Sequence, residues 1–153
     1  MKLSPDFLDL LRAFAAFEVR SMIVGGYAVA RHGRPRATKD LGVWIEASPA
    51  NAPRVLEALR EFGAPLGGLQ AEDLSRPGLG LQFGQPPLRV DILTRIDGVA
   101  FEDAWPRAIE DAIDGVPCRF ISREDLLTNK RAARRPQDLA DVAALERAQR
   151  RGG

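Results

Sequence analysis

The chain has 153 residues, with 22 Lys and Arg against 21 Asp and Glu, so its net charge is only +1. This near-neutral charge argues against a protein that coats nucleic acid along its length, and no apolar run approaches the roughly 20 residues of a membrane span. The length predicts one domain over residues 1–149, followed by a frayed tail at 150–153. The single cysteine, Cys118, favours a reducing, cytoplasmic setting and a packing role for its side chain.

The first part of the chain predicts alternating helices and strands. Apolar residues at 7, 8, 10, 11 and 14 have helical spacing, with Ser4 as a cap, and predict a helix over 6–18. Residues 21–24 predict a buried strand, and residues 27–32 a short helix that Gly33 closes. A second strand over 38–46 and an amphipathic helix ending at residue 62 follow.

The second part begins with residues 63–80, whose five glycines and two prolines predict a loop. Residues 79–83 and 88–93 predict two antiparallel strands. A helix is expected over 101–111, a strand over 116–121, and helices over 123–133 and from Pro136 to about Arg150. The fold class is therefore mixed α/β, with a mixed sheet flanked by helices and with helices at the C-terminus.

A glycine pair, Gly25-Gly26, stands between the first predicted strand and the short helix. Without Cβ atoms the backbone can approach a ligand closely, and the helix N-terminus after it offers free N–H groups to an anion. The alternative is that the pair only permits a tight turn.

Two aspartates are placed on predicted strands. Asp40 lies at the start of one strand, and Asp91 lies inside the apolar pattern of another. A buried carboxylate is costly unless it has a partner, so we expect a cation, a hydrogen-bond donor or solvent beside Asp91. Arg89 or Arg36 would be a purely structural partner.

Positive charge gathers in two places. Residues 31–39 and 130–135 each carry four Lys or Arg and no acid: Arg31, Arg34, Arg36 and Lys39, then Lys130, Arg131, Arg134 and Arg135. The clusters indicate either focused binding of an anion such as phosphate or two solvated faces. Asp138 and Asp141, at the start of the last helix, are expected to favour its dipole. Trp44 and Trp105 are expected in the core, and His32 at a cap or on the surface.

The arrangement Gly25-Gly26, thirteen residues, Asp40-x-Gly42 and then Asp91 on a later strand resembles the signature of the nucleotidyltransferase superfamily. Three further sequence segments add to the resemblance: Val24 to Ala28, Arg36 to Leu41 and Asn129 to Asp141. The resemblance covers residues 8–146. The most similar members are small bacterial proteins grouped with minimal nucleotidyltransferases and AbiEii-type toxins.

The resemblance implies a nucleoside triphosphate substrate and a divalent ion, Mg²⁺ or Mn²⁺. It assigns Asp40 as a metal ligand and Asp91 as a metal ligand or base. Nucleotide binding falls to Gly25, Gly26, Arg36, Thr38, Lys130 and Arg134. It also implies a hydroxyl acceptor on RNA, protein or a small molecule, and a possible partner protein of toxin–antitoxin type.

One residue departs from the signature. The family carries Asp-x-Asp on the strand, whereas position 42 is glycine. Glu46 cannot replace the missing carboxylate, since four residues span about 13 Å along an extended strand. We therefore expect activity to be weak or absent, whether Gly42 is natural or an introduced inactivating substitution.

Two other functions compete with nucleotidyl transfer. One is a non-catalytic protein that binds a nucleotide or acts by protein contact as a toxin–antitoxin component, which Gly42 favours. The other is a nucleic-acid-binding module that uses the two basic clusters. The small net charge makes this the least favoured of the three functions.

Overall fold

The computed structural model describes residues 2–33, 38–85 and 88–152. The helices are α1 (Pro5–Ala16), α2 (Gly25–His32), α3 (Asn51–Phe62), α4 (Ala71–Leu74), α5 (Phe101–Ala104), the 3-10 helix η1 (Trp105–Arg107), α6 (Arg123–Ala133) and α7 (Pro136–Gly152). The strands are β1 (Ser21–Val24), β2 (Asp40–Ile45), β3 (Gly80–Phe83), β4 (Arg89–Leu93), β5 (Ile109–Ile113) and β6 (Val116–Phe120).

The strands form one mixed sheet in the order β3-β4-β2-β1-β6-β5. The pairs β2–β4 and β1–β6 are parallel, and the pairs β3–β4, β1–β2 and β5–β6 are antiparallel. The predicted mixed α/β class, with its helix-flanked sheet and C-terminal helices, is confirmed.

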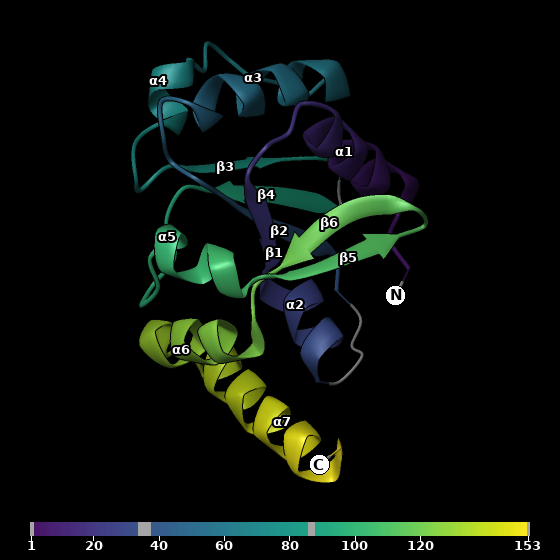
Figure 1. Ribbon diagram of the computed structural model, residues 1–153, viewed down its shortest axis with the longest axis vertical. Helices are drawn as coiled ribbons and strands as arrows, with labels where there is room; N and C mark the ends of the chain where they lie inside the picture. Colours follow the sequence, from purple (N-terminus) through teal and green to yellow (C-terminus); the bar gives the residue numbers. More distant parts are fainter. Residues whose placement is uncertain (1, 34–37, 86–87, 153) are drawn as a thin grey trace.

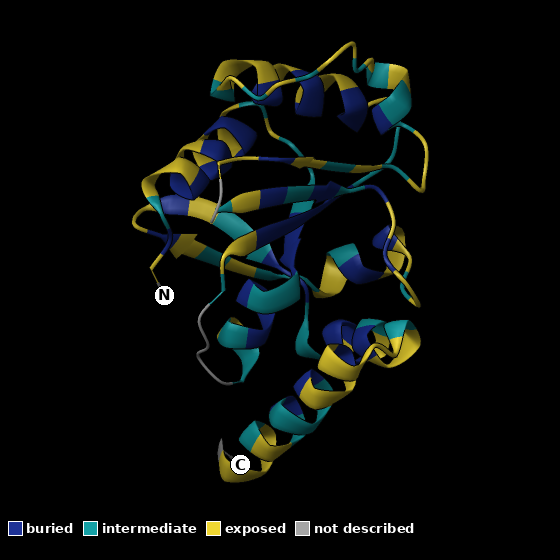
Figure 2. Ribbon diagram, turned by 180° about the vertical axis from the view of Figure 1, so that it is seen from behind, coloured by how far each residue is buried: buried dark blue, intermediate teal, exposed yellow. Residues whose placement is uncertain are grey.

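Helices cover both sides of the sheet (Figure 1). The N-terminal helices α1, α3 and α4 lie on one side, and α2, α6 and α7 lie on the other. Burial follows this layering: the central strands β1 and β2 and the helix faces toward the sheet are mostly buried, whereas the edge strands β3 and β5 and the outer helix faces are mostly exposed or intermediate (Figure 2). No helix in the described part of the chain is long and apolar enough to cross a membrane.

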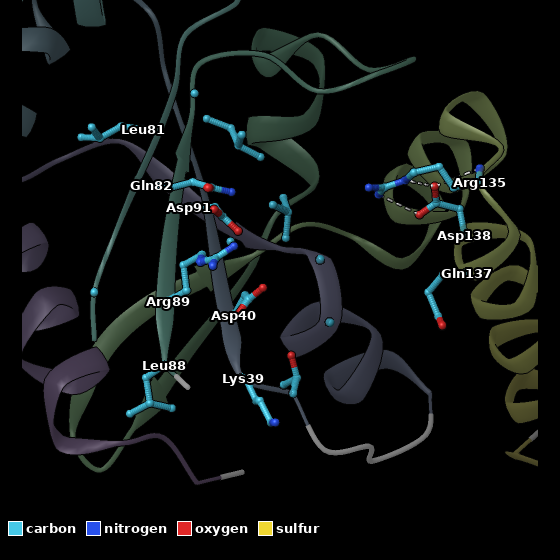
Figure 3. Close-up of a pocket in the computed structure, with 18 of the residues that line it drawn as sticks. Lys39, Asp40, Leu81, Gln82, Leu88, Arg89, Asp91, Arg135, Gln137 and Asp138 are labelled. Carbon is cyan, nitrogen blue, oxygen red and sulfur yellow. Dashed lines mark hydrogen bonds and ion pairs between the residues drawn. The ribbon is translucent and has the colours of Figure 1, made fainter. Parts of the chain in front are cut away.

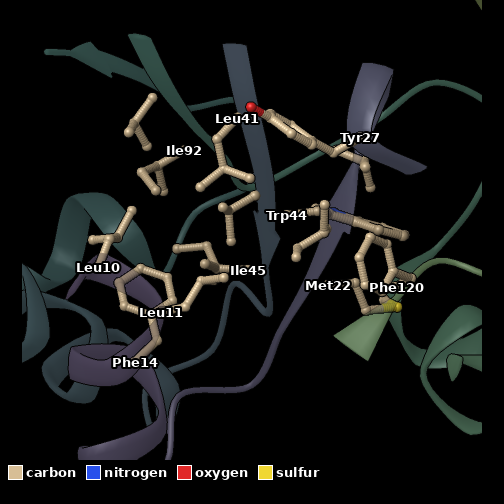
Figure 4. Packing of buried hydrophobic residues seen from close by; sticks show 14 of the residues in the cluster. Leu10, Leu11, Phe14, Met22, Tyr27, Leu41, Trp44, Ile45, Ile92 and Phe120 are labelled. Atoms are coloured by element: carbon tan, nitrogen blue, oxygen red, sulfur yellow. The ribbon is translucent and has the colours of Figure 1, made fainter. Parts of the chain in front are cut away.

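The core lies on both faces of the central strands, since consecutive residues of β1 and β2 are buried. Leu10 and Phe14 of α1 lie near Ile45 and Ile92 of the strands (Figure 4). Trp44 is 1% exposed and packs edge-on against Phe101, with 5.1 Å between ring centroids. Trp44 is therefore a core residue, as predicted.

Local signals in the sequence explain where several helices begin and end. Ser4 accepts a hydrogen bond from the Phe7 amide at 3.2 Å, so it caps α1 as predicted. The side chain of Asn51 accepts from the Arg20 amide and donates to the Arg20 and Glu46 carbonyls, which ties the start of α3 to the sheet. Gly63, with a φ of +89°, ends α3.

The prediction of one helix over 101–111 is wrong for its second half, because only residues 101–107 are helical. Helix α5 ends at Ala104, η1 contains Pro106, and strand β5 follows from Ile109. Pro106 cannot continue an α-helix. Asp114 and Gly115 then turn the chain with φ values of +50° and +78°, so β5 and β6 form a hairpin.

Smaller differences concern the connections and the last helix. A single helical turn, α4, lies inside the stretch predicted as a loop, where Gln70 and Asp73 form a capping box. Helix α7 continues to Gly152, past the predicted end near Arg150. Its buried side carries Asp138, Asp141 and Leu145 at helical spacing.

The structure also shows where Trp105 and His32 lie. Trp105 is only partly buried, and the guanidinium carbons of Arg20 and Arg119 lie 4.5 and 4.1 Å from its ring centroid. His32 is half-buried at the end of α2, and its Nε2 lies 2.6 Å from the Ile121 carbonyl oxygen. This contact ties α2 to the segment after β6, and burial lowers the pKa of His32.

Candidate functional site

A cleft of about 1180 Å³ lies between the sheet and the corner where α6 meets α7. Its volume exceeds the usual range for a single small-molecule pocket. Figure 3 shows Asp40, Arg89, Asp91 and Gln82 on the sheet side and Arg135 and Asp138 across from them. The lining also includes Val24, Gly25, Gly26, Thr38, Lys39, Gly42, Gly80, Leu81, Gly84, Leu88, Leu93, Lys130 and Gln137.

The sheet register brings the two predicted carboxylates to one face. In the parallel pair β2–β4, Asp40 stands opposite Arg89 and Gly42 stands opposite Asp91. Residues in register share a face, as do residues two apart on one strand. Asp40 and Asp91 therefore project into the same cleft from neighbouring strands.

Asp91 is the more buried of the two carboxylates. Burial raises the pKa of Asp91, a hydrogen bond from Gln82 lowers it, and the nearby Asp40 and Arg89 act in opposite directions. Gln82 stands opposite Asp91 in the antiparallel pair β3–β4. The Oδ1 atom of Asp91 is buried, and it accepts no hydrogen bond from the described residues. Such an oxygen at a cleft fits a bound cation.

Gly42 contributes no side chain that could serve as a third ligand. Among residues 2–33, 38–85 and 88–152, no three His, Cys, Asp or Glu side chains gather closely enough to hold a metal ion. Glu46, the next acid on the chain, pairs with Arg20 at 3.2 Å and accepts from Ser48. Asp40 and Asp91 are therefore the two carboxylates of the cleft that could contribute to holding a divalent ion.

The glycine pair directly follows β1 and makes up the first two residues of α2, so this helix begins two residues earlier than predicted and no separate turn precedes it. Gly25 has a φ of +69°, a conformation that an L side chain rarely adopts, although a Cβ there would meet no atom within 4 Å. The helix has no side-chain cap and no acid in its first turn. Its first N–H groups thus remain available to an anion in the cleft.

Helix α2 is fixed beside the carboxylates by Tyr27. The Tyr27 hydroxyl donates to the Thr38 carbonyl at 3.2 Å, two residues before Asp40. Burial and the charge of Asp40 raise the pKa of this hydroxyl. Thr38 lines the cleft, as predicted, and Arg36 lies outside the described residues.

The helical wall of the cleft contains a buried ionic cluster: Lys130, Asp138 and Asp141. The Lys130 ammonium lies 3.1 Å from an oxygen of each aspartate, and all three residues are at most 6% exposed. Arg135, mostly exposed, donates to Asp138 through Nε at 2.7 Å and Nη2 at 3.2 Å. These donors outweigh burial and lower the pKa of Asp138 to about 2.

This cluster corrects two interpretations. Asp138 and Asp141 do more than favour a helix dipole, because they neutralise Lys130 and join α6 to α7. Lys130 lines the cleft from within the cluster and is not part of an exposed basic face. Arg134 is exposed at the end of α6, with a φ of +61°, and Arg135 lines the cleft in its stead.

Sequence reasoning missed two cleft residues, Gln82 and Arg89, as functional candidates. Both belong to the β3–β4 hairpin that the sequence predicts, and alternation along β4 already places residues 89 and 91 on one face. That alternation was the available signal for Arg89. Gln82 needs the register of β3, which alternation along one strand does not provide.

Comparisons with known proteins support the fold. No protein-family model matches the sequence, and no curated protein matches it. The crystal structure of a lincosamide antibiotic adenylyltransferase, LnuA, with lincomycin bound, superposes with a TM-score of 0.59 and 15% sequence identity. The match covers 94% of this chain and 96% of that one. The chain therefore has a nucleotidyltransferase-like fold.

Proposed function

We propose that the chain binds a nucleoside triphosphate in the cleft and transfers a nucleotidyl group to a hydroxyl acceptor. The observation that carries this proposal is the position of Asp40 and Asp91 beside the uncapped start of α2, within one cleft. The fold shared with an adenylyltransferase supports the same chemistry. Fold alone does not select an acceptor.

The proposed reaction is a displacement at the α-phosphorus. The acceptor oxygen forms a bond to this phosphorus, the bond to the bridging α,β-oxygen breaks, and pyrophosphate leaves. Asp91 would take the hydroxyl proton, and its Oδ1, buried at the cleft without a described hydrogen-bond partner, supports this role. The N–H groups at Gly25 and Gly26 would hold phosphate oxygens.

A divalent ion completes the proposed site. Asp40 and Asp91 would hold one Mg²⁺ or Mn²⁺, which supplies positive charge against the phosphate oxygens. Because Gly42 provides no ligand, we expect turnover well below that of a site with three carboxylates. Arg36 and Thr38 remain proposed nucleotide-binding residues, and Arg135 joins them from the helical wall. Lys130, held by Asp138 and Asp141, and Arg134, which does not line the cleft, are no longer proposed for this role.

The test is a transfer assay with each labelled nucleoside triphosphate, Mg²⁺ or Mn²⁺, and bulk tRNA, cell extract or hydroxylated small molecules as acceptors. It compares the native chain with Gly42→Asp, with Gly42→Ala as the control for size. A Cβ at position 42 would lie 3.3 Å from Val24 Cγ2, so both variants need a small adjustment there. We expect slow transfer by the native chain, faster transfer by Gly42→Asp, and none by Asp40→Asn or Asp91→Asn.

A second candidate function rests on Gly42 itself. A chain that binds a nucleotide without transferring it, or that acts on a partner protein as in toxin–antitoxin pairs, needs no second Asp on β2. This candidate predicts nucleotide binding by calorimetry with no label transferred by the native chain or by Gly42→Asp. Transfer by the native chain would remove it.

A further inference from the structure

Arg89 occupies an unusual position in the cleft, among the two carboxylates. It is the first residue of β4, stands opposite Asp40 in the parallel register, and shares a strand face with Asp91 two residues on. Its guanidinium extends into the cleft between Asp40 and Asp91 (Figure 3). The positive charge of Arg89 lowers the pKa of Asp91 and so favours its ionised form.

Arg89 is not committed to either aspartate. The described ion pairs and hydrogen bonds join several other arginines to carboxylates, including Arg107 to Asp125 and Arg135 to Asp138. No such bond links Arg89 to another described side chain, and the residue is exposed. Its guanidinium can therefore move toward a ligand without breaking an ion pair within the described structure.

The cleft needs positive charge to bind a phosphate, and the Arg89 guanidinium can supply it. Two divalent ions at a phosphoryl-transfer site rely on several carboxylates to hold them, and here Gly42 removes one position beside Asp91. Two carboxylates suit one ion, so one positive charge facing the phosphate is missing. A guanidinium supplies a fixed charge, and its fork of donors matches two phosphate oxygens.

On the basis of the proposed function, we infer that Arg89 binds the phosphate of the nucleotide that is transferred. It does so in place of a second divalent ion, so that the site works with one metal ion and one arginine. Arg89 thereby compensates for the carboxylate that Gly42 lacks.

The first test measures binding rather than turnover. Inorganic tripolyphosphate and the four α,β-methylene nucleoside triphosphates are titrated by calorimetry, in EDTA and in Mn²⁺, into the native chain, Arg89→Met and Arg89→Lys. We expect about 10- to 100-fold weaker binding by Arg89→Met, in EDTA as well as in Mn²⁺, and an intermediate loss by Arg89→Lys. Arg60→Met is the matched control, since Arg60 lies on α3, is exposed and pairs with Glu57 at 2.7 Å.

The second test counts ions. Electron paramagnetic resonance with the bound analogue should give one Mn²⁺ per native chain and two per Gly42→Asp chain. In the Gly42→Asp background the Arg89→Met substitution should weaken binding less than in the native background, because the second ion then takes over the charge. Thermal unfolding of each variant verifies that the fold is kept.

The outcomes separate this inference from the proposed function. If the native chain binds neither tripolyphosphate nor any analogue, in EDTA or in Mn²⁺, the proposed function fails and the inference fails with it. If the native chain binds an analogue with two Mn²⁺ ions, or if Arg89→Met binds as tightly as Arg60→Met, the inference alone is overturned. An equal loss from Arg89→Met in both backgrounds also overturns it, since Arg89 would then not substitute for an ion.

Discussion

Lys130 shows how one side chain can hold a site together without facing its ligand. Its ammonium is buried between Asp138 and Asp141, and its removal would leave two buried carboxylates facing each other. We expect Lys130→Met to lower the free energy of unfolding by about 3–5 kcal/mol, because an uncompensated buried charge is costly. Urea denaturation measures the change.

The matched control for this prediction is Arg131→Met. Arg131 is adjacent in sequence and pairs with Glu146 at 2.6 Å, but both side chains are largely exposed. An exposed pair of this kind contributes less than about 1 kcal/mol. Similar losses from the two variants would contradict a structural role for the buried cluster.

Cys118 gives a second prediction at the residue scale. Burial raises the pKa of its thiol to about 11, and the charge of Asp111 adds to this shift. Because the thiolate is the reactive form, we expect reaction with a disulfide reagent at pH 8 to be about 100-fold slower than for a thiol of ordinary pKa. The rate should rise to the ordinary value in urea, and fast reaction of the folded chain would contradict the prediction.

At the scale of elements, the β5–β6 hairpin depends on its two-residue turn. Gly115 has a φ of +78°, and a Cβ at this position would meet no atom within 4 Å. Gly115→Ala should therefore destabilise the fold by about 1 kcal/mol through backbone conformation alone. Gly80→Ala is the control, since Gly80 has no positive φ and its Cβ would make an ordinary 3.9 Å contact with Leu93.

The helical corner shows why charged residues are hard to interpret from sequence. The basic run at 130–135 predicts a single cationic patch, yet the structure divides it. Lys130 is buried against acids from α7, Arg131 pairs on the surface, and Arg135 faces the cleft. Helical periodicity within α6 does not reveal this division, because the acids that decide it belong to the next helix.

At the scale of the molecule, the ionic cluster makes stability depend on acid pH. The pKa of Asp138 is about 2 in the folded chain and 3.8 as its ordinary value. A lowered folded-state pKa stabilises the fold above the ordinary value, and this contribution is lost as pH falls from about 4 to 2. We expect a loss of roughly 2 kcal/mol in urea unfolding across that range. The loss should be smaller for Asp138→Asn.

Most of the strands, and the positions of Asp40 and Asp91 on them, could be predicted because their signals are local. Asp40 and Asp91 stand on the predicted strands, and the glycine pair stands where β1 meets α2. The helix expected over 101–111 is wrong because apolar residues around Pro106 resemble a helical pattern, whereas Pro106 ends the helix and Asp114-Gly115 turns the chain into a hairpin. Gln82 could not be identified as a cleft residue because its position depends on which strands are neighbours, and pairing is a property of the whole sheet. Arg89 could have been identified, since alternation along β4 puts it on the same face as Asp91.

The junction between β1 and β6 has a consequence for motion. A single residue pair, Ile23 and Phe120, sets their register, and the amide of Ile121 donates to the Ile23 carbonyl at 3.1 Å. These partners lie far apart in the chain, so closing them is slow and entropically costly. The β5–β6 hairpin, which joins the sheet only through the β1–β6 pair, should therefore pair late in folding. Its amide hydrogens should exchange early in native-state opening. Since β1 leads directly into Gly25, each such opening would loosen the start of α2 at one end of the cleft.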